Sequence, residues 1–242
     1  EMDEAVETEY KRIEHKLVQV LRSDRRAAQK ILSAYLNLLT VYPDQPYDQK
    51  PILYPDSDVL IVEPENIGDA DCLGEKELRT LEIVKAAIQN GERALIYTSW
   101  VRTDSQQKLK KLLADEGYRT EILTDKIKTT DREEWVQKKL AAGMQVLIVN
   151  PSLVETGLDL NAFTTLVFYS MGYKLFTLRQ ASRRSWRINQ KAPSVKVYML
   201  YYEDTMQQKC LKLMASKLAV AGLIEGNFSE EGLAAMSDVQ DM

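Results

Sequence analysis

Apolar residues near the start of the chain recur at steps of three and four, the spacing that places them on one face of a helix. The first such stripe consists of Val6, Tyr10, Ile13, Leu17, Val20 and Leu21. After Ser23-Asp24, a candidate helix cap, a second stripe consists of Ala27, Ala28, Ile31, Leu32, Tyr35, Leu36 and Leu39. The pattern predicts two helices within a helical extension over residues 1–50.

Prolines and aspartates interrupt this pattern after residue 42. Pro43, Pro46, Pro51 and Pro55 exclude a continuing helix, since proline lacks the backbone N–H that a helix interior needs. We expect an irregular connection over residues 51–74, with one short strand in the apolar run 59–62.

From Glu75 onward, helical patterns alternate with short apolar runs. Several of the helices are expected to end at a glycine, as at Gly117 and Gly143. The runs at 94–97, 120–123, 145–149, 165–169 and 195–200 are rich in β-branched and aromatic residues, which is typical of buried strands. The order predicts an α/β fold with a doubly wound, mostly parallel sheet and helices on both faces, over residues 75–242. Ligands of such sheets bind beyond the carboxyl ends of the strands.

Composition excludes several classes of protein. No apolar run approaches the roughly 20 residues that cross a bilayer, and the acidic N-terminus lacks a secretory pattern, so we expect no membrane association and a cytoplasmic location. Two cysteines and one histidine cannot form a four-ligand zinc site, and no other metal site is indicated. The net charge of -4 argues against nucleic-acid binding by bulk attraction.

One segment departs from this acidic average. No Asp or Glu occurs from Asn161 through Tyr202, whereas seven Lys and Arg side chains fall between Lys174 and Lys196. If 180–190 is helical, Gln180, Arg184 and Arg187 project from one face. Two guanidinium groups one turn apart can then bind a phosphate whose negative charge spreads over its oxygens during phosphoryl transfer. The alternative is an arginine-rich helix exposed to solvent.

A second segment, 154–160, follows a predicted buried strand. Its Gly157 lets the backbone approach a ligand, and the Asp159 carboxylate can accept hydrogen bonds from a ribose or bind an arginine. An ordinary loop with a turn glycine is the alternative for this segment taken alone.

Together the two segments resemble conserved motifs of superfamily 2 helicases. Residues 150–160 resemble helicase motif V, and 180–190 resembles motif VI in the form QxxxRxxRxxQ that Swi/Snf-like translocases carry. Residues 95–100 are similar to motif IV, and Arg132 stands where the family places an arginine before an aromatic-containing helix. The chain thus resembles the C-terminal, second RecA-like domain of a helicase or translocase, closest to the Swi/Snf-like branch.

The resemblance implies a role for each matching residue. Arg187 is the expected arginine finger on the ATP γ-phosphate, with Arg184 beside it as the second catalytic residue. The nucleotide cleft on this side would be formed by Gln180, Gly157, Asp159 and Glu155. Nucleic acid, with DNA favoured over RNA, would be contacted near Thr98, Ser99, Thr124, Ser152 and Thr156. Such contacts to phosphates fix position without reading bases.

Some residues depart from the family pattern. Trp186 replaces the usual histidine, Asn189 a glycine, and Arg183 an acidic or small residue. No G-x-x-x-x-G-K-[ST] loop and no Asp-Glu box occur, so ATP phosphates and Mg²⁺ would be held mainly by a first RecA-like domain that precedes this chain. We therefore do not expect the chain alone to hydrolyse ATP.

Two further functions are open on the sequence. A RecA-like module without catalysis could act by docking nucleic acid or protein, although such a module need not keep two arginines in register. The nucleotide-sugar half of a glycosyltransferase also binds a nucleotide beyond strand ends, but it needs an acidic ribose ligand that the acid-free stretch lacks.

Overall fold

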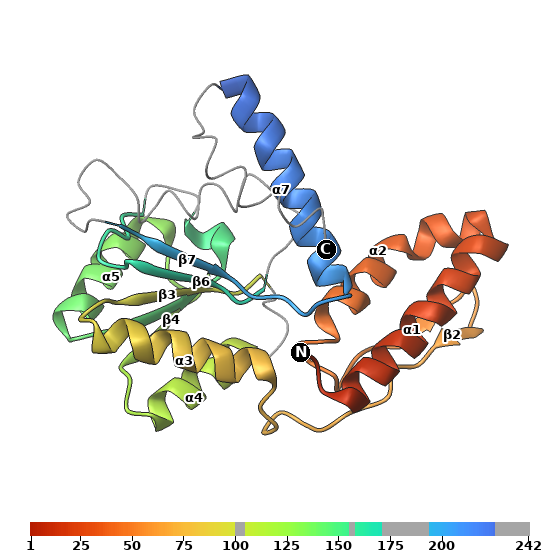
Figure 1. Ribbon diagram of the computed structural model, residues 1–242, viewed down its shortest axis with the longest axis horizontal. Coiled ribbons are helices and arrows are strands. Elements are labelled where there is room, and N and C mark those ends of the chain that lie inside the picture. Colours follow the sequence, from red (N-terminus) through yellow and green to blue (C-terminus); the bar gives the residue numbers. More distant parts are fainter. Residues whose placement is uncertain (100–104, 155–157, 171–193, 226–242) are drawn as a thin grey trace.

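A computed structural model describes residues 1–99, 105–154, 158–170 and 194–225, the last eight of these by their backbone alone. An α-helical extension lies beside an α/β domain (Figure 1). The extension contains α1 (Glu4–Ser23), α2 (Arg25–Val41), β1 (Ile52–Leu53) and β2 (Leu60–Val62). The α/β domain contains α3 (Glu75–Gln89), β3 (Ala94–Tyr97), α4 (Ser105–Asp115), β4 (Thr120–Leu123), the 3-10 turn η1 (Thr129–Asp131), α5 (Arg132–Ala141), β5 (Val146–Val149), η2 (Pro151–Val154), β6 (Thr165–Phe168), β7 (Lys196–Met199) and α7 (Met206–Glu225).

The α/β domain is built on five parallel strands in the order β4-β5-β3-β6-β7. Every residue of β3, β5 and β6 is buried, because helices cover both faces of the sheet. The helices α3 and α4 lie on one face of the sheet, and α5 and α7 lie on the other (Figure 1). Their apolar side chains belong to two separate clusters, one on each face. The predicted doubly wound α/β fold is confirmed.

The predicted strands agree with the structure to within one residue at each end. Gly143, expected to end a helix, has φ of 88°, a conformation that L side chains rarely adopt. The connection contains two paired strands, whereas the sequence predicts one. The additional strand, β1, has two residues and is too short to show an alternation of apolar and polar positions. The sequence also predicts a helix around 175–185 and a short one from 229, and both segments lie outside the described residues.

The extension is an α-helical hairpin backed by β1 and β2. Asp24 ends α1 and caps α2, its side chain accepting hydrogen bonds from Arg26 N and Ala27 N, both at 3.0 Å. Tyr10, Ile13, Leu17 and Leu39 are among the buried side chains of a separate core. None of the described helices has the length and apolarity needed to cross a membrane.

Buried polar contacts join the extension to the α/β domain. The Thr205 hydroxyl accepts a hydrogen bond from Gln207 N in the first turn of α7. The Gln207 side-chain amide donates to Thr40 O at 2.9 Å, and Met206 N donates to the Tyr10 hydroxyl at 2.8 Å. The start of α7 is therefore fixed to both helices of the extension.

An ion pair crosses the same junction. Lys76 Nζ lies 2.8 Å from Asp44 Oδ1, with the two side chains 5% and 2% exposed. Burial raises the pKa of Asp44, while the charge of Lys76 opposes that rise. A charge left alone at this depth would be costly, so each partner of the pair requires the other.

We predict that Lys76→Met lowers the free energy of unfolding by about 3 kcal/mol at pH 8, the cost of removing one partner of a buried pair. Without Lys76 the folded-state pKa of Asp44 rises further above its unfolded value. The folded state then binds the proton more tightly, and the loss should shrink as the pH falls towards 5. Urea denaturation at both pH values measures this.

Lys85→Met is the matched control, because Lys85 is exposed on the same helix. This change should alter the free energy of unfolding by less than about 0.5 kcal/mol. If Lys76→Met and Lys85→Met lowered the free energy of unfolding equally and at every pH, a stabilising ion pair at the junction would be contradicted.

Candidate functional site

Polar residues meet where β3 and β6 end. Ser99 N donates to Ser170 Oγ at 2.8 Å, and Ser99 Oγ donates to Ser170 O at 3.0 Å. The chain leaves β3 towards the β4 side of the sheet and leaves β6 towards β7, on the opposite side. This divergence marks the topological switch point, where open α/β sheets bind their ligands.

Asn150, after β5, extends this network to the next strand. Its side-chain amide donates to Ser99 O at 3.2 Å, and its Oδ1 accepts from Ser152 N at 2.9 Å and Ser152 Oγ at 2.7 Å. Ser152 is exposed while Asn150 is half-buried. The network thus holds an exposed hydroxyl at the edge of the sheet.

Thr98 and Thr124, both predicted to lie near nucleic acid, differ in their surroundings. Thr98 is fully buried, and its hydroxyl accepts a hydrogen bond from Gln106 Nε2 at 2.7 Å. Thr124 is half-buried at the end of β4, and its carbonyl accepts from Ile127 N at 3.2 Å. The Thr98 hydroxyl therefore orients α4 from below the surface, and of these two residues only Thr124 is partly exposed.

The first turn of α5 binds the segment that follows β5. The Arg132 guanidinium donates to Ile127 O at 3.2 Å and to Leu153 O at 2.9 Å. The next residue, Glu133, accepts from Asp159 N at 2.9 Å. Two consecutive side chains of one helix thus fix Leu153 and Asp159, on either side of residues 155–157.

The Asp159 carboxylate is engaged locally. Its oxygens accept from Asn161 N at 3.1 Å and from the Asn161 side-chain amide at 3.2 Å. These contacts form an Asx-type turn that leads towards β6. The described geometry gives Asp159 a structural contact in addition to its predicted role in the cleft.

Six of the predicted site residues lie outside the described part of the chain. They are Glu155, Thr156, Gly157, Gln180, Arg184 and Arg187. Their assigned roles stay predictions.

The sequence places Asn150 and Ser170 directly beyond the ends of predicted strands, where ligands of such sheets bind, but it does not indicate Glu133. The structure joins Asn150 and Ser170 to Ser99 through hydrogen bonds. Glu133 carries no signal in the sequence, because its bond to Asp159 N links residues from separate elements.

Comparison with known protein families gives a match to the helicase conserved C-terminal domain over residues 76–189. The matched range begins in α3 and includes the carboxyl ends of β3, β5 and β6, with the whole network around Ser99. Residues 76–189 are therefore similar to this family. The expected second RecA-like domain of a superfamily 2 helicase is thereby confirmed.

Individual relatives agree with this family. The chain is 26% identical over 182 residues to the chromatin-remodeling ATPase INO80 of Candida albicans, a match that covers 75% of the chain and 12% of that protein. Among solved structures, the C-terminal part of the Fun30 ATPase domain matches 67% of the chain and 52% of its own, with a TM-score of 0.52 and 19% identity. The latter likeness supports the fold of the helicase C-terminal domain.

We predict that Arg132→Ala loosens the segment after β5 in this helicase C-terminal domain. The change removes a charged donor from Ile127 O and Leu153 O, and one such hydrogen bond contributes about 1.5 kcal/mol, roughly tenfold in a local opening equilibrium. Amide hydrogen exchange over residues 150–154 should accelerate by that factor, while exchange in β3 stays unchanged.

Lys128→Ala provides the control, because Lys128 is an exposed cation four residues before Arg132. The same exchange rates in both variants would show that Arg132 does not hold this segment.

Proposed function

We propose that this chain is the second motor domain of an ATP-dependent nucleic-acid helicase or translocase, from the Swi/Snf-like branch. The observation that carries the proposal is the agreement between the family match over 76–189 and the polar network at the switch point of the sheet. The likeness to a chromatin-remodeling ATPase supports the choice of branch.

Nucleic acid would cross the domain beyond the carboxyl ends of the strands. Ser99, Thr124 and Ser152 lie at the ends of three neighbouring strands, and Thr156 follows in the sequence. Hydroxyl and backbone N–H groups suit phosphate oxygens, so these contacts would hold the strand without reading its bases. DNA is the favoured substrate, because the INO80 relative is named for chromatin.

ATP would lie between this domain and a first RecA-like domain. Arg187 would be the finger on the γ-phosphate, with Arg184 beside it and Gln180, Gly157 and Glu155 in the cleft. Asp159 would fix the backbone next to them through its turn with Asn161. The first domain would hold the phosphates and Mg²⁺, since the sequence lacks a phosphate loop.

Closure of the two domains on ATP and their reopening after hydrolysis would step the protein along a strand. The junction of α7 with α1 and α2 supports this cycle, because buried contacts such as Gln207 to Thr40 favour movement of the extension with the domain as one body.

We predict that the chain alone has no measurable ATPase. In a protein that joins it to a first motor domain, Arg187→Ala should lower nucleic-acid-stimulated ATPase about a thousandfold, the usual effect of losing an arginine finger. Affinity for nucleic acid should stay within about twofold, since phosphate tracking does not use the finger. A steady-state ATPase assay and a binding titration measure the two quantities.

Arg179→Ala is the matched control, as an arginine outside the motif pattern. Unchanged turnover in Arg187→Ala would exclude the finger role. A joined protein with no ATPase, whose isolated domain still binds nucleic acid or protein, would favour the docking module instead.

A further inference from the structure

The charge of the helical extension changes sign along its length. Residues 1–14 contain six acidic and two basic side chains, whereas residues 15–43 contain five basic side chains and one acidic one. The basic group surrounds the turn between α1 and α2, which lies at the far end of the extension from the sheet (Figure 1). Its members are Lys16, Arg22, Arg25, Arg26 and Lys30.

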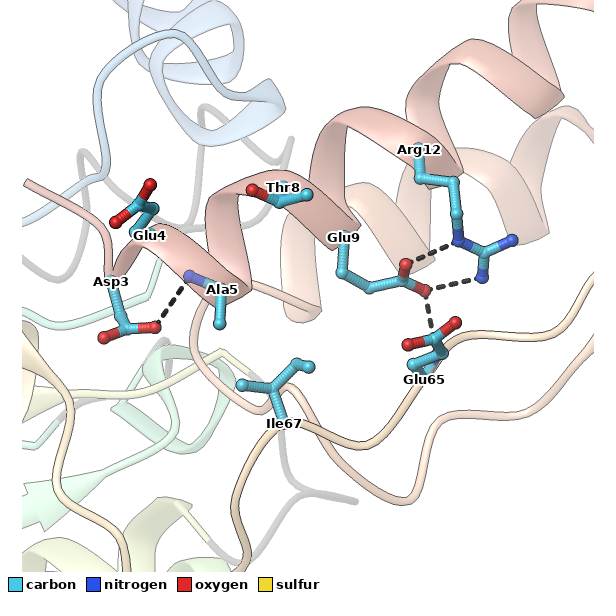
Figure 2. Close-up of a pocket in the computed structure, with 8 residues that line it drawn as sticks. All are labelled: Asp3, Glu4, Ala5, Thr8, Glu9, Arg12, Glu65 and Ile67. Carbon is cyan, nitrogen blue, oxygen red and sulfur yellow. Dashed lines mark hydrogen bonds and ion pairs between the residues drawn. The ribbon is translucent and has the colours of Figure 1, made fainter.

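Near the sheet, the basic side chains of α1 are used within the fold. Arg12 forms two hydrogen bonds with Glu9, at 2.5 and 2.7 Å, and a third with Glu63 O at 2.7 Å. Glu9 also accepts from Glu65 N at 2.8 Å (Figure 2). Burial acts to raise the pKa of Glu9, but Arg12 and this N–H outweigh it and hold the pKa below its ordinary value. Arg12 therefore has a structural role.

The three arginines at the turn have no such role. Arg22, Arg25 and Arg26 are exposed, and within the described part of the chain their side chains make no hydrogen bond or ion pair. Lys30, by contrast, pairs with Asp56. Packing does not explain why three always-charged side chains occur within five positions.

Helix electrostatics oppose this arrangement. Arg25 and Arg26 occupy the first turn of α2, where the helix dipole is positive, and that turn contains no acidic residue. Asp24 supplies one negative charge as the cap, against three positive ones. An external anion would relieve the repulsion, and the forked guanidinium group fits phosphate oxygens.

The extension lies beyond the edge of the sheet that carries the polar network. The chain that leaves the carboxyl end of β7 reaches α7, whose first residues bind α1 and α2 through Met206 and Gln207 (Figure 1). With 20 residues, α1 is about 30 Å long, so the turn stands well away from the sheet. The turn can therefore reach a part of a duplex that the sheet edge does not touch.

We propose that Arg22, Arg25 and Arg26 form a second nucleic-acid contact, which binds the phosphate backbone of a duplex independently of sequence. This turn surface rests on the proposed function only in taking nucleic acid as its ligand. The turn surface raises the affinity for the duplex and fixes the direction from which the duplex approaches the motor domain. Binding at this surface requires neither ATP nor the arginine fingers.

The test is binding of the 242-residue protein to a fluorescent DNA duplex over a series of salt concentrations. The triple variant Arg22→Ala, Arg25→Ala, Arg26→Ala should reduce the slope of log K against log salt by about 0.9 for each lost phosphate contact, or about 2.7 in total. Its affinity at low salt should fall about tenfold or more. The temperature of thermal unfolding should not fall, because all three side chains are exposed and their removal relieves the repulsion at the start of α2.

The matched control removes three exposed cations elsewhere, with Lys85→Ala, Lys138→Ala and Lys212→Ala. Its net charge equals that of the test variant, so bulk attraction predicts the same small loss for both. Equal slopes in the two triple variants would overturn the turn surface.

Ser152→Glu separates this proposal from the proposed function, because it places a negative charge at the edge of the sheet. If Ser152→Glu weakens binding and the arginine variant does not, the motor track stands and the turn surface fails. The opposite result supports the turn surface and contradicts the track. Tighter binding of poly-glutamate than of duplex, lost in the arginine variant, would assign the turn to an acidic protein and overturn the proposal.

Discussion

The parallel arrangement of five buried strands is the constraint on which the rest of the molecule depends. Parallel strands must be joined by crossovers, and these crossovers place helices on both faces and gather the carboxyl ends at one edge. Because the chain leaves β3 and β6 towards opposite sides of the sheet, the topological switch point lies at Ser99 and Ser170. Within the described part of the α/β domain, every residue that we assign to nucleic acid follows a strand at this edge.

The hydrogen bonds at this edge connect strands rather than neighbours in sequence. Asn150 links β5 to Ser99, and Arg132 links the start of α5 to Leu153. A shift of one loop would therefore be transmitted to the next through a short, directional contact. This arrangement is suited to a domain whose proposed work requires nucleic-acid contacts and a nucleotide cleft to move together.

The extension shows a different balance of forces. Near the sheet, its charges are paired and partly buried, as in Glu9 with Arg12 and Asp44 with Lys76, so they fix its position. At the turn between α1 and α2, the charges of Arg22, Arg25 and Arg26 are exposed and unpaired within the described residues. One hairpin thus combines a structural end with an end whose charges are available to a ligand.

Local pattern was enough to predict the strands of the five-stranded sheet, the helices of the extension and those between the strands, the Asp24 cap and the family motifs. Each of these depends on residues close in sequence, where the period of apolar residues and the position of glycine determine the backbone. The two-residue β1 could not be predicted, because its pairing with β2 depends on a partner strand and not on its own pattern.

Only the tertiary structure decided the order of the strands, the burial of Thr98, the joining of Ser99 to Ser170 and the pairing of Lys76 with Asp44. These features arise when residues far apart in the chain exclude water together. The free energy gained by this burial depends on which surfaces come into contact, and the local sequence pattern does not determine that.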